Sequence, residues 1–516
     1  MSEPPAGDRS AGDRRSRRRP RGEAATPLAD KPFRHTRNPF APIEPLSAEQ
    51  LHQIDDASLR ILEEIGIDFL DDEALDLWAA AGAEVDRATQ HVRIDRALLR
   101  ELVGRAPGSF VLRARNPARS LTLGGDAINF ATVGGAPFYS DLEKGRRPGT
   151  LADFRQMVKL AQQCGPIHLV EGLLLEPQDV PVPVRHLEKA LAQFTLSDKA
   201  LTAAAHGRAV AADYVAMAAI VYGEAALAEG PVFASIVNAN SPLRFDERML
   251  GGLIGYARLG QATVITPFIL AGAMSPVTLA AAIAQQNAEA LAGIALTQLV
   301  RPGAPVVYGG FTTNIDMQTG SPAFGTPEGA LALLCGGQLA RHYGVPFRGS
   351  GGLNNAKSVD AQASYETQLS LWPAVMAHAN LILHSAGWLE AGLVCSLEKF
   401  IIDVEGLAVM QRLLDGIVID EETLALPFIA EVGPGGHHLG TAHTLARYRS
   451  EFYMPIVSDR QNYDKWREDG SHDAARRAHT VAGQLLAAYE PPPLDPAVAE
   501  ALADFVARRK RELVKE

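Results

Sequence analysis

Apolar residues recur with a helical spacing over residues 46–107. Leu51, Ile54, Ile61 and Ile65 follow one another mostly at three to four residues or multiples of that spacing, and Ser47 stands where it can cap the first helix. This spacing places apolar side chains on one face of a helix. We therefore expect an N-terminal helical cap, with approximate bounds at residues 41–125.

Short apolar runs then alternate with longer amphipathic stretches. Eight runs have the length and composition of strands that are buried on both faces. They cover residues 128–132, 167–175, 200–205, 232–237, 263–270, 306–311, 346–349 and 381–384. Helical patterns follow most of them, for example at residues 150–163, 244–259, 276–299, 326–343 and 360–377. Eight strand–helix units in order predict an α/β fold, a closed (β/α)8 TIM barrel over residues 126–418.

A doubly wound open sheet is the structural alternative to the barrel. The first strand leads into Gly134-Gly-Ala-Pro137, which lacks the G-x-G-x-x-G spacing of dinucleotide-binding sheets. The barrel is therefore favoured. At the ends of the chain we expect a disordered basic tail over residues 1–40, where arginines gather between Arg14 and Arg21, and a helical C-terminal extension over residues 419–516.

Composition excludes several classes of function. Lys and Arg total 49 against 60 Asp and Glu, and the resulting net charge of −11 offers no field for nucleic-acid phosphates. Every apolar run is broken before the ~18–20 residues of a membrane-spanning helix. We therefore expect neither a nucleic acid nor a membrane as partner.

Cysteine and histidine spacing argues against a metal site. Cys164, Cys335 and Cys395 lie far apart without a C-x-x-C pair, which favours neither a disulfide framework nor a thiolate site and fits a reducing cytoplasmic location. His437, His438 and His443 lack the H-E-x-x-H spacing of a helical zinc site. We predict no bound metal.

Aromatic, amide and charged residues gather after the last three predicted strands. In a TIM barrel the active site lies at the carboxyl ends of the strands. The residues in question are Tyr308, Phe311 and Asp316 after the sixth strand, Arg348, Asn354 and Lys357 after the seventh, and His384, Trp388 and Glu390 after the eighth. Aromatic faces attract quaternary ammonium groups by ~0.5–2 kcal/mol each. The loops thus suit an organic cation with a polar handle, although the same rings could simply pack the barrel mouth.

At these loops the chain resembles the trimethylamine methyltransferase family of corrinoid-dependent methyltransferases, which includes the glycine betaine methyltransferases. The resemblance runs from about Leu46 into the C-terminal region and rests on separate motifs in the right order. They are Ser241-Pro-Leu, Ser275-Pro-Val, Asn287-Ala-Glu-Ala-Leu-Ala-Gly293, Gly325-Thr-Pro-Glu328, Tyr343-Gly-Val-Pro346, Asn355-Ala-Lys357, Ala386-Gly-Trp-Leu-Glu390 and Asp459-Arg460. Members of this family are (β/α)8 barrels, which agrees with the strand count.

Leu353 stands where the resemblance places the pyrrolysine of the trimethylamine enzymes, four residues ahead of Lys357. Leucine has no electrophilic imine with which to hold a neutral amine. The family's Asp two residues before the lysine is here Asn355. The resemblance therefore implies the non-pyrrolysine branch, whose best-known activity is the demethylation of glycine betaine.

The resemblance implies that a methyl group moves from a quaternary amine, such as glycine betaine, to the Co(I) corrinoid (cobalamin) of a partner protein. A quaternary nitrogen departs as a neutral tertiary amine, so the enzyme must supply alignment, worth ~7–11 kcal/mol, rather than an acid. The chain lacks a D-x-H-x-x-G motif, so we expect the corrinoid on a separate protein and no cofactor bound here. The expected roles are an ammonium wall of Tyr308, Phe311 and Trp388, a carboxylate site of Arg348, Asn354 and His384, and catalytic support from Glu390 and Asp316.

Three alternatives remain beside this interpretation. The chain could act as a trimethylamine-type methyltransferase on another methylated amine, as a lyase or aldolase with Lys357 as Schiff-base amine, or as a non-catalytic betaine-binding protein. The outer helices of the barrel also provide surfaces for a homo-oligomer.

Overall fold

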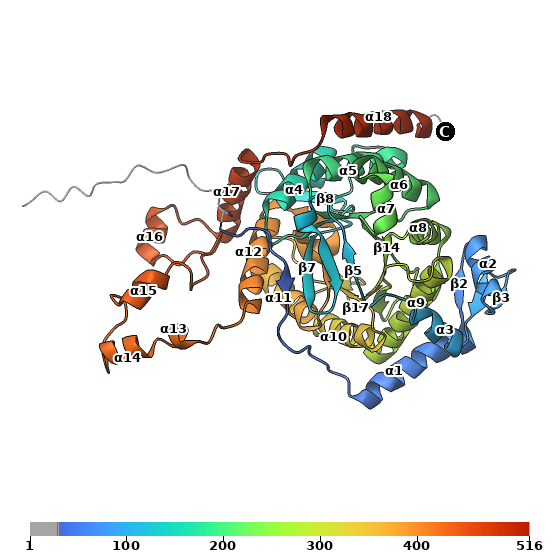
Figure 1. Ribbon diagram of the computed structural model, residues 1–516, viewed down its shortest axis with the longest axis horizontal. Helices are drawn as coiled ribbons and strands as arrows, with labels where there is room; N and C mark the ends of the chain where they lie inside the picture. The colour runs from blue at the N-terminus through green and yellow to red at the C-terminus, as the bar shows by residue number, and fades with distance from the viewer. Residues whose placement is uncertain (1–27, 29, 515–516) are drawn as a thin grey trace, which may run out of the picture.

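A closed parallel barrel forms the centre of the computed structural model, which describes residue 28 and residues 30–514 (Figure 1). Its strands are β7 (Ala127–Thr132), β10 (Leu169–Val170), β11 (Ala200–Ala203), β12 (Ala234–Val237), β14 (Ala262–Ile265), β16 (Val306–Gly309), β19 (Phe347–Ser350) and β20 (Leu381–Ala386). Each strand pairs with the next, and β20 pairs with β7 to close the sheet. The predicted TIM barrel is confirmed, and every barrel strand overlaps the run that predicted it.

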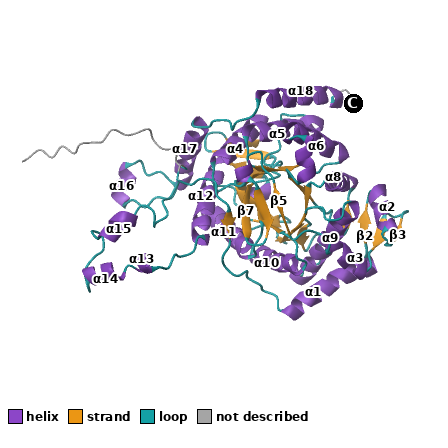
Figure 2. Cartoon of the chain, in the orientation of Figure 1, coloured by secondary structure: helices purple, strands orange, loops and turns teal. Residues whose placement is uncertain are grey.

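A ring of helices surrounds the barrel (Figure 2). The ring consists of α4 (Leu151–Gln163), α5 (Val182–Leu196), α6 (Arg208–Tyr222), α8 (Glu247–Arg258), α9 (Leu279–Val300), α10 (Pro327–His342), α11 (Ala361–Met376) and α12 (Leu397–Leu414). Several begin at a residue whose side chain accepts a hydrogen bond from the first turn, as Thr150, Thr326 and Asp360 do. Such caps satisfy amides that have no partner inside the helix, which is why these helices begin where the pattern predicted.

Small apolar side chains fill the inside of the barrel. Ala131, Ala200, Val264 and Val307 belong to one buried cluster there. The hairpin of β5 (Ser109–Leu112) and β6 (Leu121–Gly124) immediately precedes β7 and adds leucines to the same cluster. The amino end of the barrel is therefore plugged, and chemistry is left to the carboxyl end.

The N-terminal segment mixes helices with short strands. It contains α1 (Ala48–Arg60), a π-helical turn (Ile61–Ile65), α2 (Asp72–Ala80) and α3 (Arg96–Val103), together with β2 (Ile67–Phe69), β3 (Glu84–Asp86) and β4 (His91–Arg93). These strands form one sheet with β13 (Arg244–Phe245). Ser47 caps α1 as predicted, and helices are present as expected, but the helical spacing did not reveal the short strands that accompany them. Strands of three residues carry too few positions to show alternation beside a helical pattern.

Part of the expected basic tail is ordered. Residues 1–27 and residue 29 lie outside the described residues. Beyond them, β1 (Thr36–Arg37) pairs antiparallel with β7, and the side chain of Asn38 donates to Val375 O at 2.8 Å. The expectation of disorder up to residue 40 is therefore wrong for this stretch, because the backbone of β1 finds partners on the barrel.

The C-terminal segment contains α13 (Glu421–Leu424), α14 (Leu426–Val432), α15 (Ala442–Arg447), α16 (Tyr463–Glu468), α17 (Ala474–Ala487) and α18 (Pro496–Leu513). Helix α17 packs on α12 and α4, and α18 packs on α5 and α6. Residues 416–450, by contrast, extend away from the ring of helices (Figure 1). Within the described residues, no helix combines the length and the apolar content needed to cross a bilayer.

Candidate functional site

Two small sheets continue from the barrel strands and build the rim of the carboxyl end. One contains β15 (Phe268–Ala271), β17 (Phe311–Ile315) and β18 (Pro322–Ala323). The other contains β8 (Phe138–Asp141), β9 (Gly145–Pro148), β21 (Trp388–Leu389) and β22 (Val394–Ser396). Strands β17 and β21 follow β16 and β20 almost directly, so their aromatic residues stand beside the strand ends.

A left-handed backbone at His384 interrupts the alternation of strand β20. Leu381 and Leu383 belong to the cluster inside the barrel, whereas Ile382 belongs to the outer core. His384 has φ +57°, and the pairing of β20 with β7 shifts register between Ile382 and Ala386. Its imidazole contacts Arg348 and the amide of Gly134. A non-glycine residue in this conformation is strained, and such strain is concentrated at functional sites.

Arg348 and His384 present hydrogen-bond donors to each other. Arg348 Nη1 donates to Gly310 O at 3.3 Å, and Arg348 Nη2 lies 3.2 Å from His384 Nε2. Burial and the nearby guanidinium lower the pKa of His384 well below its ordinary value, so the ring is neutral and has one N–H. The Gly134 amide donates to Nδ1 at 3.2 Å, which places that hydrogen on Nε2. Two donors that face each other at this distance suit an anionic oxygen.

The guanidinium of Arg348 is buried without a counterion. Arg348 is 1% exposed, and the described residues provide no carboxylate oxygen within 4.0 Å of its guanidinium nitrogens. Its Nε also has no hydrogen-bond partner there. Burial lowers the pKa of Arg348 to about 9, and Glu171 acts in the opposite direction. A buried charge without a partner is costly, so this arrangement indicates a place for an anion of the ligand.

Glu171 is a further polar group at the same end of the barrel, and the sequence pattern did not reveal it. It directly follows β10, is 2% exposed and has no partner for Oε2 within the described chain. A Cβ added at Gly134 would lie 2.8 Å from Glu171 Cγ and 3.4 Å from His384 Cε1, so Gly134 leaves room for both side chains. Burial raises the pKa of Glu171, while Thr202 and Arg348 oppose the shift, and the net effect favours the neutral acid.

Aromatic rings gather beside this polar group. The ring centroids of His384 and Trp388 are 4.6 Å apart, those of Phe311 and His384 5.5 Å, and those of Phe324 and Trp388 5.4 Å. The guanidinium of Arg348 lies over the Phe311 ring, 5.0 Å from its centroid. Phe311 and Trp388 therefore come together as predicted. Phe324, which follows the hairpin strand β18, is an addition that strand-end position did not reveal.

Leu353, at the pyrrolysine position, lines a small cavity beside these rings. The cavity measures about 30 Å³ and also touches Phe311, Phe324 and Ser350. Such a volume holds a water molecule or two. A methylated ammonium group is larger, so at least one neighbouring ring must shift when such a group enters this space.

Tyr308 and Asn354 have other positions than those expected. Val307 faces the barrel interior, so its neighbour Tyr308 points outward and donates to Asn287 Oδ1 of α9 at 3.1 Å. The expectation that Tyr308 walls an ammonium group is therefore wrong in this structure. Asn354 is buried and exchanges hydrogen bonds with Trp388: its Nδ2 donates to Trp388 O at 2.6 Å, and the indole N–H donates to Asn354 O at 3.1 Å. Asn354 fixes the indole, although its Oδ1 is left without a partner.

The predicted catalytic carboxylates are not part of this cluster. Glu390 accepts two hydrogen bonds from Arg146 of β9, at 2.7 and 3.3 Å. Asp316 is half-buried and accepts from the hydroxyl of Thr319 at 2.6 Å, within the turn between β17 and β18. Both carboxylates thus stabilise the rim and do not face Arg348.

Other candidates from the sequence lie in ordinary surroundings. Lys357 is exposed, and its Nζ donates to Asn355 O at 2.8 Å, so it does not point into an enclosed site. All three cysteines are buried, and burial raises the pKa of Cys164 to about 12. No group of three or more potential metal ligands occurs among the residues that the structure describes.

Comparison with known proteins places the chain in a family. A sequence model described as trimethylamine methyltransferase (MTTB) matches residues 10–514. The glycine betaine methyltransferase of Desulfitobacterium hafniense strain Y51 is 41% identical over 91% of this chain and 98% of its own length. The trimethylamine methyltransferase MttB of strain DSM 10664 / DCB-2 is 31% identical over 90% and 94%.

A solved structure, the monomethylamine methyltransferase MtmB of Methanosarcina barkeri, aligns with a TM-score of 0.48 and 8% identity over 88% of this chain and 90% of its own. The barrel itself is established by the strand order described above. Since the sequence model spans nearly the whole length, the chain belongs to the trimethylamine methyltransferase family.

Proposed function

We propose that this methyltransferase takes a methyl group from a quaternary ammonium carboxylate of the glycine betaine kind and transfers it to the Co(I) corrinoid of a partner protein. The observation that carries the proposal is the buried guanidinium of Arg348, which has no counterion among the described residues and faces the N–H of His384 beside aromatic rings. A carboxylate and an ammonium group in one molecule would satisfy both halves of this site.

The residues of this chain bind and orient the substrate in this mechanism. Arg348 and His384 hold the carboxylate, while Phe311 and Trp388 surround the methylated nitrogen and exclude water. When the carrier docks at the barrel mouth, the corrinoid supplies the two-electron nucleophile. The N–CH₃ bond breaks, its electron pair stays on nitrogen, and the methyl carbon bonds to cobalt, so no proton is transferred.

The surroundings of the cation match this reaction. Positive charge leaves the nitrogen in the transition state, so an ionised carboxylate beside it would stabilise the ground state more than the transition state. Aromatic faces interact more weakly and exclude water. Burial raises the pKa of Glu171, which disfavours an ionised carboxylate at this end of the barrel.

Methyl transfer to free Co(I)-cobalamin tests the proposal. With glycine betaine, the absorbance of methyl-Co(III) should appear with the wild-type protein and should be greatly reduced with Arg348→Met. The proposal is contradicted if glycine betaine gives no methyl-Co(III) while a neutral methylated amine does. Absence of turnover with every methylated amine, together with tight betaine binding, would instead identify a binding protein.

A further inference from the structure

Residues 416–450 form an arm that buries almost nothing of itself. The arm contains α13, α14 and α15, and Thr441 is its sole buried residue. Large apolar side chains nonetheless occur along it: Ile417, Val418, Ile419, Leu424, Leu426, Ile429, Leu439, Leu445 and Tyr448 are between 45% and 87% exposed. A segment that buries no apolar surface gains little to offset the conformational entropy of ordering it. The arm therefore requires an outside surface.

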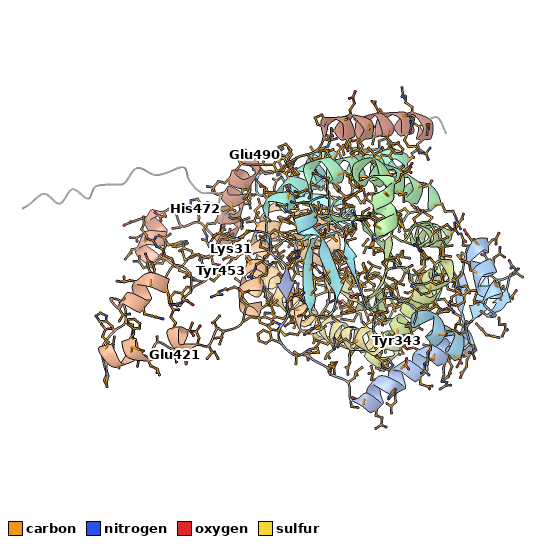
Figure 3. All side chains as sticks on the ribbon, viewed as in Figure 1. Lys31, Tyr343, Glu421, Tyr453, His472 and Glu490 are labelled. Carbon is orange, nitrogen blue, oxygen red and sulfur yellow. The ribbon has the colours of Figure 1, made fainter. Side chains whose placement is uncertain are left out.

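Both ends of the arm are fixed to the body of the protein. Asp415 accepts from Arg34 at 2.7 Å where α12 ends. After the arm, Glu405 of α12 is 7% exposed and accepts from the amides of Val457 and Ser458, both at 2.8 Å. Figure 3 shows Tyr453 and Lys31 near the body and Glu421 far out on the arm. Fixed ends set the direction of the arm, unlike a free tail.

The body carries a second apolar surface that no other part of the described chain covers, which we call the flank patch. It comprises Tyr365, Leu369 and Trp372 of α11, which are 61%, 40% and 41% exposed. Their spacing of four and three residues places them on one stripe of the helix. Phe40 and Ile43 are also exposed, and their backbones bond to His378 and Met376 at the end of α11.

The arm and the flank patch belong to the same region of the molecule. Helices of a TIM barrel start at the carboxyl face and end at the amino face, so α11 and α12 both end away from the site. Figure 1 shows the arm leaving the ring on the side of these two helices.

We propose that the arm packs on the flank patch of a second copy of this chain, and that the second copy's arm packs on the first. A two-fold axis makes this exchange reciprocal, so both unpartnered surfaces are buried by one interface. Stable interfaces use about 20–30 residues on each side, and arm and patch together provide a surface of that size. The occupant is a second copy because one chain carries both complementary surfaces.

The mass of the full-length protein in solution tests this proposal. Two double variants, Leu426→Glu with Ile429→Glu in the arm and Leu369→Glu with Trp372→Glu in the patch, target the two surfaces separately. The control, Val182→Glu, changes a side chain that is 68% exposed on α5. Far-ultraviolet circular dichroism confirms that each variant is folded, which the exposure of the substituted side chains leads us to expect.

Light scattering should give at least two chains for the wild type and for the control. Each double variant should weaken self-association at least a hundredfold. A wild-type protein with the mass of a single chain overturns the proposal. An assembly that keeps its mass in either double variant overturns it as well. Loss of the assembly in only one of the two double variants therefore excludes the pairing of arm with patch.

Discussion

Arg348 and His384 reach each other from neighbouring strands because the backbone of His384 is left-handed. With an ordinary extended backbone, position 384 would follow the alternation that directs Ile382 to the outer core. The turn of this one residue brings a neutral N–H opposite a buried guanidinium. The proposed carboxylate site thus depends on a strained residue that the surrounding barrel holds in place.

Substitution of Trp388 tests the aromatic half of the site. Trp388→Ala removes a ring 4.6 Å from His384, and loss of a cation–π contact of ~1–2 kcal/mol should raise KM for betaine about tenfold. Initial rates of methyl-Co(III) formation at varied betaine concentration measure this change. Trp466→Ala, which removes a tryptophan of α16, is the matched control and should leave KM unchanged. An unaltered KM in Trp388→Ala would exclude the ring from the binding site.

Glu171 gives the site a dependence of stability on pH. Its pKa in the folded protein is raised by burial, so the native state binds the proton more tightly than the unfolded chain does. The free energy of unfolding therefore decreases as pH rises from the unfolded value near about 4.3 through the folded pKa. In Glu171→Gln the side chain cannot ionise, so this decrease in the free energy of unfolding should not occur.

Urea unfolding of the wild type and Glu171→Gln at pH 5 and pH 7.5 measures the effect. The variant should gain stability relative to the wild type at the higher pH. An equal difference between the two proteins at both pH values would show that Glu171 ionises in the folded state as readily as in the unfolded chain.

The rule that TIM-barrel sites lie at the carboxyl ends of the strands identified part of the candidate site and missed another part, for physical reasons. It selected Arg348 and His384 but missed Glu171, because the second predicted strand extends to residue 175 and so includes Glu171, whereas strand β10 ends at Val170. Tyr308 was misplaced because a wholly apolar strand gives no sign of which face lines the barrel. Phe324 reaches the cluster through the hairpin of β17 and β18, a tertiary feature that strand counting does not show.

The barrel strands and helices were predictable because most strands are short, predominantly apolar runs and helix starts carry capping residues. The run over residues 167–175 shows the limit of this reasoning, since only Leu169–Val170 form strand β10. The chain turns at Gly172, where an added Cβ would lie 2.5 Å from Thr202 O. An apolar loop that packs closely on its neighbour is indistinguishable from a buried strand in sequence.

Helix α17 has a pH-sensitive contact with α12. His479 Nδ1 lies 2.8 Å from Glu398 Oε1, and this hydrogen bond, with the charges of Glu398 and Glu143, raises the pKa of His479. The stabilisation is fully present below the unfolded pKa near about 6.5 and is lost as pH rises through the folded value. His479→Gln should therefore lower the free energy of unfolding by less than about 1 kcal/mol at pH 6, and by still less at pH 9.

Thermal or urea unfolding at these two pH values checks the contact. His437→Gln, an exposed histidine on the arm, serves as the control and should show no such change. A cost for His479→Gln that is equal or greater at pH 9 would contradict the ion-pair interpretation.

At the scale of the whole molecule, the proposed interfaces lie at different places on the barrel. The carboxyl end carries the proposed substrate site and is where the proposed corrinoid partner would approach. The amino end is plugged by the hairpin of β5 and β6, and the arm leaves the flank beside α11 and α12. Two copies joined through arm and flank patch would therefore meet at the flank of the barrel.

A cycle of two substrates and two proteins tests the central claim most directly. Rates of methyl-Co(III) formation, as kcat/KM, are measured for glycine betaine and for tetramethylammonium, which has no carboxylate, with the wild type and with Arg348→Met. We predict that the substitution lowers kcat/KM at least a hundredfold for glycine betaine and much less for tetramethylammonium, since only the former has a carboxylate for the guanidinium to bind. An equal loss for both substrates would contradict the account, because Arg348 would then act without contacting the carboxylate.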